Sequence, residues 1–125
     1  MENALGKTTW LLPDMFWPTV THGDSYVSHE AVCVLNVGNA DAKVTLTLFY
    51  EDREPVEGFC VVCPAMRTTH IRMDMLKDAK GEPVPRGVGY AARVTSDVPV
   101  VVQYTRVDTT QPELALMTAM AYPLS

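Results

Sequence analysis

The chain has 125 residues, of which 47% are hydrophobic and 20% charged, with a formal net charge of −5. This length suits one domain, which we expect to span residues 1–125, and an acidic chain without a basic run argues against nucleic acid as a partner. No apolar stretch approaches the ~20 residues of a membrane-spanning helix, and the N-terminus lacks the pattern of a secretory signal, so we expect a cytoplasmic protein.

Short segments rich in β-branched and aromatic residues alternate with clusters of turn residues along the whole chain. This pattern predicts an all-β fold, a single-domain antiparallel β-sandwich of about eight strands. In chain order, we expect strands at residues 8–12, 27–37, 43–50, 59–63, 66–73, 88–95, 98–107 and 114–122. We expect a structured loop or an irregular edge at 13–24, a loop at 81–87, and one helical turn at 74–80 with Asp74 as its N-cap.

The evidence for a strand differs in strength between two of these segments. In residues 43–50, the apolar Val44, Leu46 and Leu48 alternate with the polar Lys43, Thr45 and Thr47, which is the period of a half-buried strand. At the other extreme, Pro112 and Glu113 resemble a helix entry, whereas residues 114–122 also alternate in a strand register. Because the rest of the chain is rich in β signal, we favour a strand.

The chain has three cysteines, and two of them, Cys60 and Cys63, form a CxxC pair. A zinc site would need a second pair or suitably spaced histidines, and neither follows in the sequence. A redox motif would lie at the start of a helix, whereas these cysteines fall in a predicted strand. We therefore interpret them as packing thiols.

Ionisable and amide side chains interrupt three of the apolar segments that otherwise look like buried strands. Burying an unpaired charge or amide costs several kcal/mol, so strands normally keep such groups on the solvent side or at their ends. A repeated exception indicates a shared polar patch or cleft on the sheet. The candidate ligand-binding residues are Ser28, His29, Glu30, Arg67, His70, Arg72, Gln103, Arg106 and Asp108.

These candidates do not form a recognisable catalytic or metal motif. His29, His70 and Glu30 have the donor types of a two-histidine, one-carboxylate site, but successive residues in a strand point to opposite faces. Ser28 is adjacent to His29, yet no Gly-x-Ser-x-Gly elbow accompanies it. We therefore predict no metal, no cofactor and no enzymatic activity. Two interpretations of Arg106 stay open: an internal ion pair, or a donor for a ligand hydroxyl, carboxylate or phosphate.

The sequence closely resembles the sensory rhodopsin transducer family. The resemblance runs in order along nearly the whole chain, through the blocks GKTTW (6–10), SHEAVCVLN (28–36), YEDREPV (50–56), PAMRTTHIR (64–72), VPVVVQYTRVD (98–108) and AMAY (119–122). The nine candidate residues fall on recurrent polar positions of that family. Two features depart from the family pattern: Phe16-Trp17-Pro18 in the first loop, and Tyr104 where a histidine is typical.

The resemblance implies a β-sandwich protomer that assembles into a homotetramer and binds a small molecule, with sugars or related metabolites favoured. Some members of the family are partners of a microbial rhodopsin. The main functional hypothesis is therefore non-enzymatic binding of a sugar-like metabolite coupled to signalling. The alternative is a soluble transducer that docks on the cytoplasmic face of a microbial sensory rhodopsin or another membrane receptor. Whether the polar residues form a ligand site or a subunit interface is left open.

Overall fold

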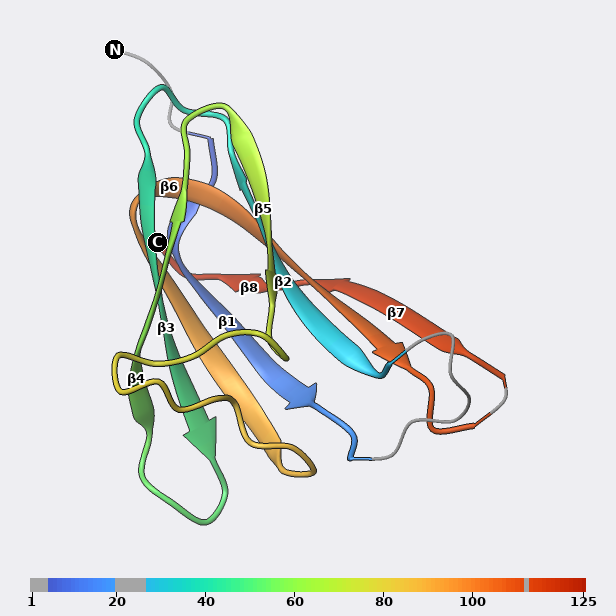
Figure 1. Ribbon diagram of the computed structural model, residues 1–125. Helices are drawn as coiled ribbons and strands as arrows, with labels where there is room; N and C mark the ends of the chain where they lie inside the picture. Colours follow the sequence, from blue (N-terminus) through green and yellow to red (C-terminus); the bar gives the residue numbers. More distant parts are fainter. Residues whose placement is uncertain (1–4, 20–26, 112) are drawn as a thin grey trace.

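The computed structural model describes residues 5–19, 27–111 and 113–125 (Figure 1). Its strands are antiparallel and no helix occurs in these ranges, so the prediction of an all-β fold with about eight strands is confirmed. None of these residues forms a helix that could span a membrane. The strands are β1 (Lys7–Phe16), β2 (His29–Asn36), β3 (Ala42–Tyr50), β4 (Val56–Cys63), β5 (Arg67–Arg72), β6 (Gly89–Asp108), β7 (Ala115–Met120) and β8 (Tyr122–Pro123).

One long strand, β6, belongs to both layers of the structure. Its first half pairs with β1 and β3, and with β4 and β8 these strands form sheet A. Its second half pairs with β2 and β7, and β5 completes sheet B beyond β2. Figure 1 shows β6 crossing the molecule from one layer to the other. The two sheets are therefore joined by continuous backbone.

The change of sheet occurs around Pro99 and Val100, where the pairing partners of β6 change. Proline has no N–H to donate to a ladder, so a corner where pairing is interrupted accommodates it. Gly6 lies against this corner with a φ of 103°, and a Cβ there would sit 2.2 Å from the Val100 carbonyl oxygen. The indole Nε1 of Trp10 donates to that same oxygen at 3.1 Å.

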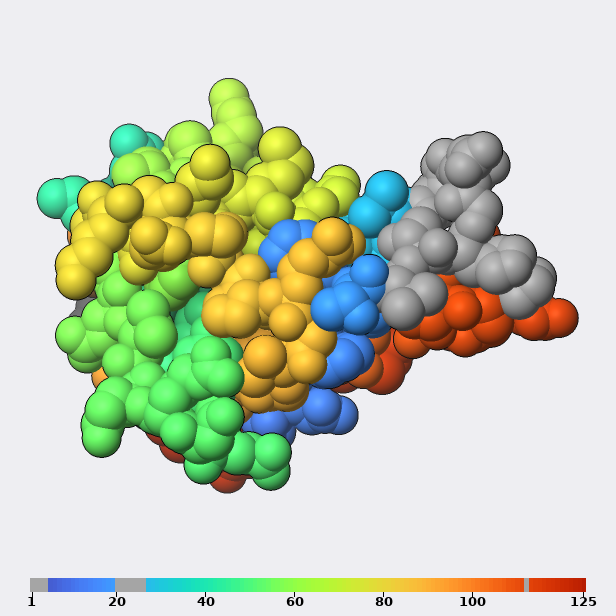
Figure 2. All heavy atoms as spheres, turned by 60° about the horizontal axis from the view of Figure 1, so that its bottom comes forward, coloured from blue at the N-terminus to red at the C-terminus, as the bar shows by residue number. Residues whose placement is uncertain are grey.

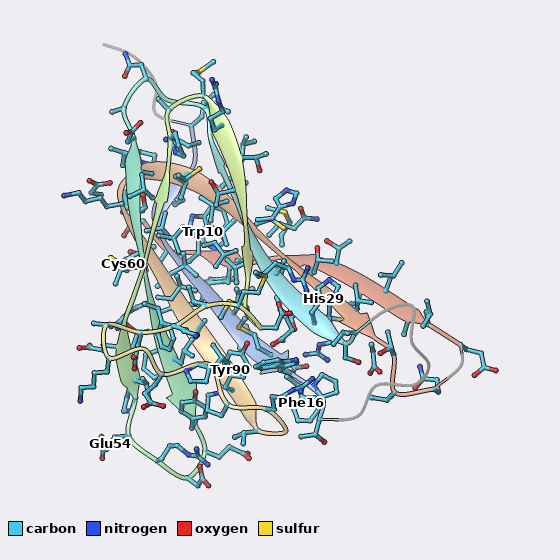
Figure 3. All side chains as sticks on the ribbon, viewed as in Figure 1. Trp10, Phe16, His29, Glu54, Cys60 and Tyr90 are labelled. Carbon is cyan, nitrogen blue, oxygen red and sulfur yellow. The ribbon has the colours of Figure 1, made fainter. Side chains whose placement is uncertain are left out.

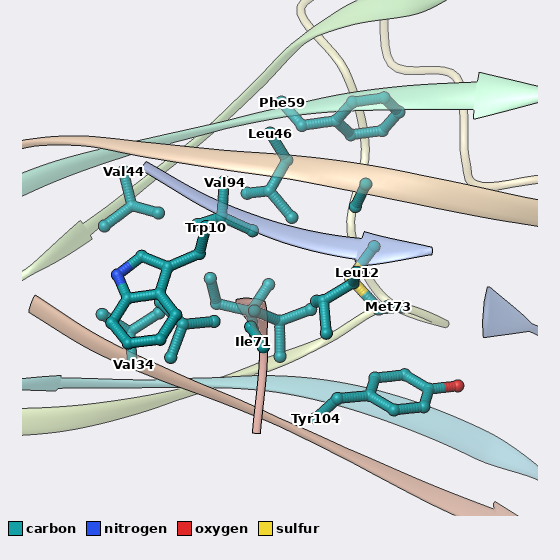
Figure 4. Close-up of a cluster of buried hydrophobic side chains, with 14 of the residues drawn as sticks. Trp10, Leu12, Val34, Val44, Leu46, Phe59, Ile71, Met73, Val94 and Tyr104 are labelled. Carbon is teal, nitrogen blue, oxygen red and sulfur yellow. The ribbon is translucent and has the colours of Figure 1, made fainter. Parts of the chain in front are cut away.

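The hydrophobic core lies between the two sheets (Figure 4). Sheet A contributes alternate residues of its strands, such as Leu46 and Val94, and sheet B contributes residues such as Val34 and Ile71. All four side chains are at most 4% exposed. The predicted apolar set Val44, Leu46 and Leu48 is thus the buried side of β3. In the alternate set Lys43 is exposed and Thr45 half-buried, whereas Thr47 is buried.

Several predicted boundaries differ from the observed strands. The predicted strands 88–95 and 98–107 form one continuous strand of 20 residues. β1 runs on to Phe16 past a register shift between Leu12 and Met15, so residues 13–16 form an irregular end of this strand and not a loop; residues 20–24 lie outside the described ranges. The C-terminal segment is extended, as predicted, but divided into β7 and β8. Residues 74–80 form turns and a bridge from Lys77 to Pro83 in place of a helical turn.

The cysteine pair is divided between two environments. Cys63 is fully buried and its Sγ lies 3.7 Å from the Val34 carbonyl oxygen, whereas Cys60 is exposed. Two residues that are three positions apart on a strand have side chains on opposite faces of the sheet. The two thiols therefore do not share a site on β4.

Candidate functional site

A buried carboxylate, that of Glu30, lies where β1, β2 and β6 meet. Its side chain is fully buried. Three donors satisfy it: the Tyr90 hydroxyl bonds Oε1 at 2.6 Å, the Phe16 backbone N–H bonds Oε2 at 2.7 Å, and the Tyr104 hydroxyl also bonds Oε2. Buried carboxylates are tolerated only with such partners.

Arg106 extends this network to the surface. Its Nε donates to the Tyr104 hydroxyl oxygen at 2.9 Å and lies 4.0 Å from Oε2 of Glu30. Its Nη2 lies 3.4 Å from the Asp14 carbonyl oxygen and 3.8 Å from the Asp14 carboxylate, which is exposed. We call Glu30, Tyr90, Tyr104, Arg106 and the Phe16 N–H the Glu30 cluster.

The electrostatics of the cluster keep its tyrosines protonated. Burial, followed by the adjacent Glu30 charge, raises the pKa of both Tyr90 and Tyr104 well above the ordinary tyrosine value. Both phenols therefore act as permanent donors to the carboxylate. Because Phe16 and Tyr90 belong to sheet A and Glu30 and Tyr104 to sheet B, the cluster clamps the two sheets together.

A second group of candidate residues lies on the outer face of sheet B, away from the core. The register places His70, Cys33 and Gln103 in one row across β5, β2 and β6, with Arg72 and His29 in neighbouring rows on the same face. Arg72 forms a bidentate pair with Asp74 at 2.8 Å, and Gln103 donates to the Thr118 hydroxyl. Figure 3 shows His29 on β2, separate from Phe16 and Tyr90.

The remaining candidates have local partners. Ser28 is fully buried, and its Oγ accepts from the Thr109 backbone N–H at 2.8 Å. The Asp108 carboxylate accepts from the backbone N–H and hydroxyl of Thr110, which lower its pKa. Arg67 is exposed at the start of β5. The structure therefore brings Glu30 and Arg106 together and places His29, His70, Arg72 and Gln103 on the other side of the sheet.

Sequence reasoning missed the two tyrosines that hold Glu30. The sequence marks Tyr104 as a departure from the family pattern and as a candidate stacking face for a ligand, not as a donor to Glu30, and it does not single out Tyr90. The sequence does hold a signal for Tyr104. Arg106 lies two residues further along the strand, so the two side chains share one face of the sheet. Tyr90 is 60 residues from Glu30 in sequence, and nothing local to either residue indicates that contact.

A surface depression of about 370 Å³ adjoins the cluster. Its lining includes Asp14, Tyr50, Glu51 and Tyr90. The Tyr50 hydroxyl is buried and has no hydrogen-bond partner within the described residues. Those residues contain no group of three or more histidine, cysteine or acidic side chains placed to hold a metal ion. The depression therefore offers aromatic rings and carboxylates to a ligand.

Comparison with known proteins relates the chain to one family. Residues 5–123 match the family model described as Anabaena sensory rhodopsin transducer. The crystal structure of Thermotoga maritima 1070 matches with a TM-score of 0.84 and 34% identity, covering 95% of this chain and 96% of that one. The solved Anabaena sensory rhodopsin transducer matches with a TM-score of 0.74 and 37% identity, covering 84% of this chain and 99% of that one. A search of curated proteins gave no match.

Proposed function

The chain belongs to the Anabaena sensory rhodopsin transducer family, and we propose from this membership that it is a non-enzymatic transducer of a membrane receptor. It would work in the cytoplasm, dock on the cytoplasmic face of a receptor of the sensory rhodopsin type, and relay the receptor's state. The observation that carries this proposal is the 37% identity to a solved sensory rhodopsin transducer over 84% of this chain. The match to the family model, over residues 5–123, includes both the Glu30 cluster and sheet B.

We assign the docking surface to the outer face of sheet B. Three strands in unbroken register make this face broad, and it carries polar side chains that the core does not use, among them His29, His70 and Gln103. Protein interfaces depend on such side chains for register and specificity. The Glu30 cluster lies on the opposite side of the same strands, so a shift of β2 caused by docking would reach the contact between the two sheets.

Binding to Anabaena sensory rhodopsin in lipid nanodiscs tests this proposal. We expect the protein to bind these nanodiscs more tightly than empty ones, and the His70→Glu variant to bind about 10-fold more weakly, because a new carboxylate in an interface must be desolvated without a partner. The matched control is Cys60→Glu, which adds the same charge at an exposed position of sheet A. Equal binding to loaded and empty nanodiscs, or equal losses in the two variants, would contradict the proposal.

A second proposed activity is the binding of a sugar-like metabolite by a homotetramer. The depression beside the Glu30 cluster favours it, because a polyhydroxyl ligand could donate to the exposed Asp14 and Glu51 carboxylates and pack on the tyrosine rings. Tyr90 belongs to both the depression and the cluster, so a ligand there would contact the clamp between the sheets directly.

A thermal-shift screen with sugars, sugar acids and nucleotides tests the second activity. A ligand present at 100 times its Kd stabilises the folded state by about 2.7 kcal/mol, which is a clear rise in melting temperature. We expect Glu51→Ala to reduce the shift while changing the stability of the unliganded protein little, since Glu51 lines the depression and is exposed. A panel without any shift, or an undiminished shift in Glu51→Ala, would count against a site in this depression.

A further inference from the structure

Cys33 on β2 and His70 on β5 lie directly opposite each other on the outer face of sheet B. Cys33 is half-buried and His70 is exposed. Within the described residues no group bonds to the His70 imidazole, whereas the Nδ1 of His29 donates to the Val27 carbonyl oxygen at 2.8 Å. A thiol and an unused imidazole are therefore neighbours on a surface that solvent reaches.

The hydrogen-bond register brings these two side chains as close as an antiparallel sheet allows. The Met73 N–H donates to the Glu30 carbonyl oxygen at 2.9 Å, so these two residues are a hydrogen-bonded pair. Bonded and non-bonded pairs alternate along an antiparallel ladder, and Cys33–His70 lies three pairs further along. It is therefore a non-bonded pair, in which the Cα atoms are about 4.5 Å apart and the side chains are closest. The sequence alone predicts no metal here, because it does not show that β2 pairs with β5.

The spacing of such a pair suits one metal ion. An ion with a thiolate on one side and an imidazole on the other separates their sulfur and nitrogen atoms by about 4.3 Å, the sum of typical metal–sulfur and metal–nitrogen distances. Side chains of a strand stand roughly perpendicular to the sheet, so the Cys33 sulfur and a His70 ring nitrogen rise side by side from the two strands. A change of side-chain rotamer is then enough to place an ion between them.

We propose that Cys33 and His70 bind a soft monovalent metal ion, Cu(I) being the biological example, through one sulfur and one nitrogen. Within the described residues no third histidine, cysteine or acidic side chain is grouped with them. Zinc sites use four ligands, and calcium and magnesium take oxygen ligands, so two donors of this kind do not suit those ions. Thiolate sulfur selects Cu(I), and imidazole also suits copper.

The neighbours of the pair add no further strong donor. Gln103 lies opposite Cys33 on β6 and carries an amide. The Asp74 carboxylate is held by Arg72 in a bidentate contact at 2.8 Å. The acidic hairpin 51–54, between β3 and β4, lies at the end of the molecule that faces forward in Figure 2, where it is green. Hard cations, which prefer carboxylate oxygen, are therefore not drawn to this pair.

The charge balance also favours a monovalent ion. Burial raises the pKa of the Cys33 thiol above its ordinary value, and a hydrogen bond from Thr105 offsets part of the rise. The thiol of the free protein is therefore protonated at neutral pH, and the ion replaces that proton on sulfur while the proton passes to solvent. A thiolate with a monovalent ion has no net charge, whereas a divalent ion would leave a positive charge on a half-buried site.

Competition for Cu(I) with the chromophoric chelator bicinchoninate, in the absence of oxygen, tests this site. The chain offers a matched control thiol, because Cys60 is exposed and lies opposite Thr45 instead of a histidine. We expect the Cys60→Ser variant, which keeps Cys33, to bind Cu(I) at least ~10-fold more tightly than the Cys33→Ser variant, which keeps Cys60. Equal affinities would mean adventitious binding to any accessible thiol and would overturn the proposal.

The contribution of His70 is tested in the Cys60→Ser background. We expect His70→Asn to weaken Cu(I) binding at least ~10-fold, because asparagine has no basic nitrogen to bind the ion. His70 is exposed, so the melting temperature of this variant should stay near that of its parent. X-ray absorption by the bound ion should show one sulfur and one nitrogen ligand. Unchanged affinity in His70→Asn, or sulfur ligands alone, would overturn the proposal. No receptor takes part in either measurement, so the result is independent of docking.

Discussion

Glu30→Ala is expected to lower the free energy of unfolding by about 3–5 kcal/mol, the cost of breaking a buried ionic network from one side. The substitution leaves two buried phenols and the Phe16 N–H without an acceptor. It also leaves Arg106 without its buried counter-charge. Urea unfolding monitored by circular dichroism measures the change. The effect is large because the same carboxylate ties β1 and both halves of β6 to β2.

Glu30→Gln separates the role of hydrogen bonding from that of simple burial. Glutamine has the same shape and keeps one acceptor oxygen, and the Tyr90 hydroxyl can accept a bond from its amide, so we expect a loss of about 1–3 kcal/mol. Tyr104→Phe, which removes one donor, should fall in the same range. A Glu30→Ala variant as stable as Glu30→Gln would contradict the clamp role of the cluster.

Trp10→Ala is expected to cost about 3–5 kcal/mol, the range for deleting a large buried aromatic side chain. Trp10 is 5% exposed and packs in the core between the sheets (Figure 4). Its Nε1 also bonds the Val100 and Lys7 carbonyl oxygens beside the corner of β6. The same urea titration reports the loss.

Trp10→Phe tests the polar part of this contact. It keeps an aromatic ring but leaves the Val100 carbonyl oxygen without the indole donor, so we expect a loss of about 1–3 kcal/mol. Trp10→Ala should exceed it clearly, because alanine leaves a cavity as well. A Trp10→Ala variant within about 1 kcal/mol of the native protein would show that the indole does not hold the corner.

The strands could be predicted from the sequence because their signals are local. Residues 43–50 alternate with period 2, and β3 buries the apolar set as expected. The predicted strands 88–95 and 98–107 leave Ser96 and Asp97 between them as a turn, yet β6 continues through both residues. Ser96 pairs with Val44, and the Asp97 carboxylate accepts the Lys43 N–H at 2.8 Å. Those partners are about half the chain away in sequence, so the turn propensity of Ser96 and Asp97 alone predicts the wrong local structure.

The candidate site was predictable only in part for the same reason. A glutamate inside an apolar strand must have partners, and the sequence supports that statement about Glu30. It does not identify Tyr90 or Tyr104 as the donors, because each contact joins distant segments. Because successive residues of a strand point to opposite faces, the sequence does predict that His29 and Glu30 lie on opposite sides of the sheet. Which other candidates share a face depends on how β2, β5 and β6 pair, and sequence periodicity does not give that register.

Affinity for Anabaena sensory rhodopsin in the dark and under illumination tests the transducer role most directly. A protein relays a receptor's state only if it binds the receptor's states with different affinities. We therefore expect titration of rhodopsin nanodiscs with this protein to give Kd values that differ at least 5-fold between dark and light, a coupling of about 1 kcal/mol. Binding with the same Kd in both conditions, or no binding beyond empty nanodiscs, would contradict the account.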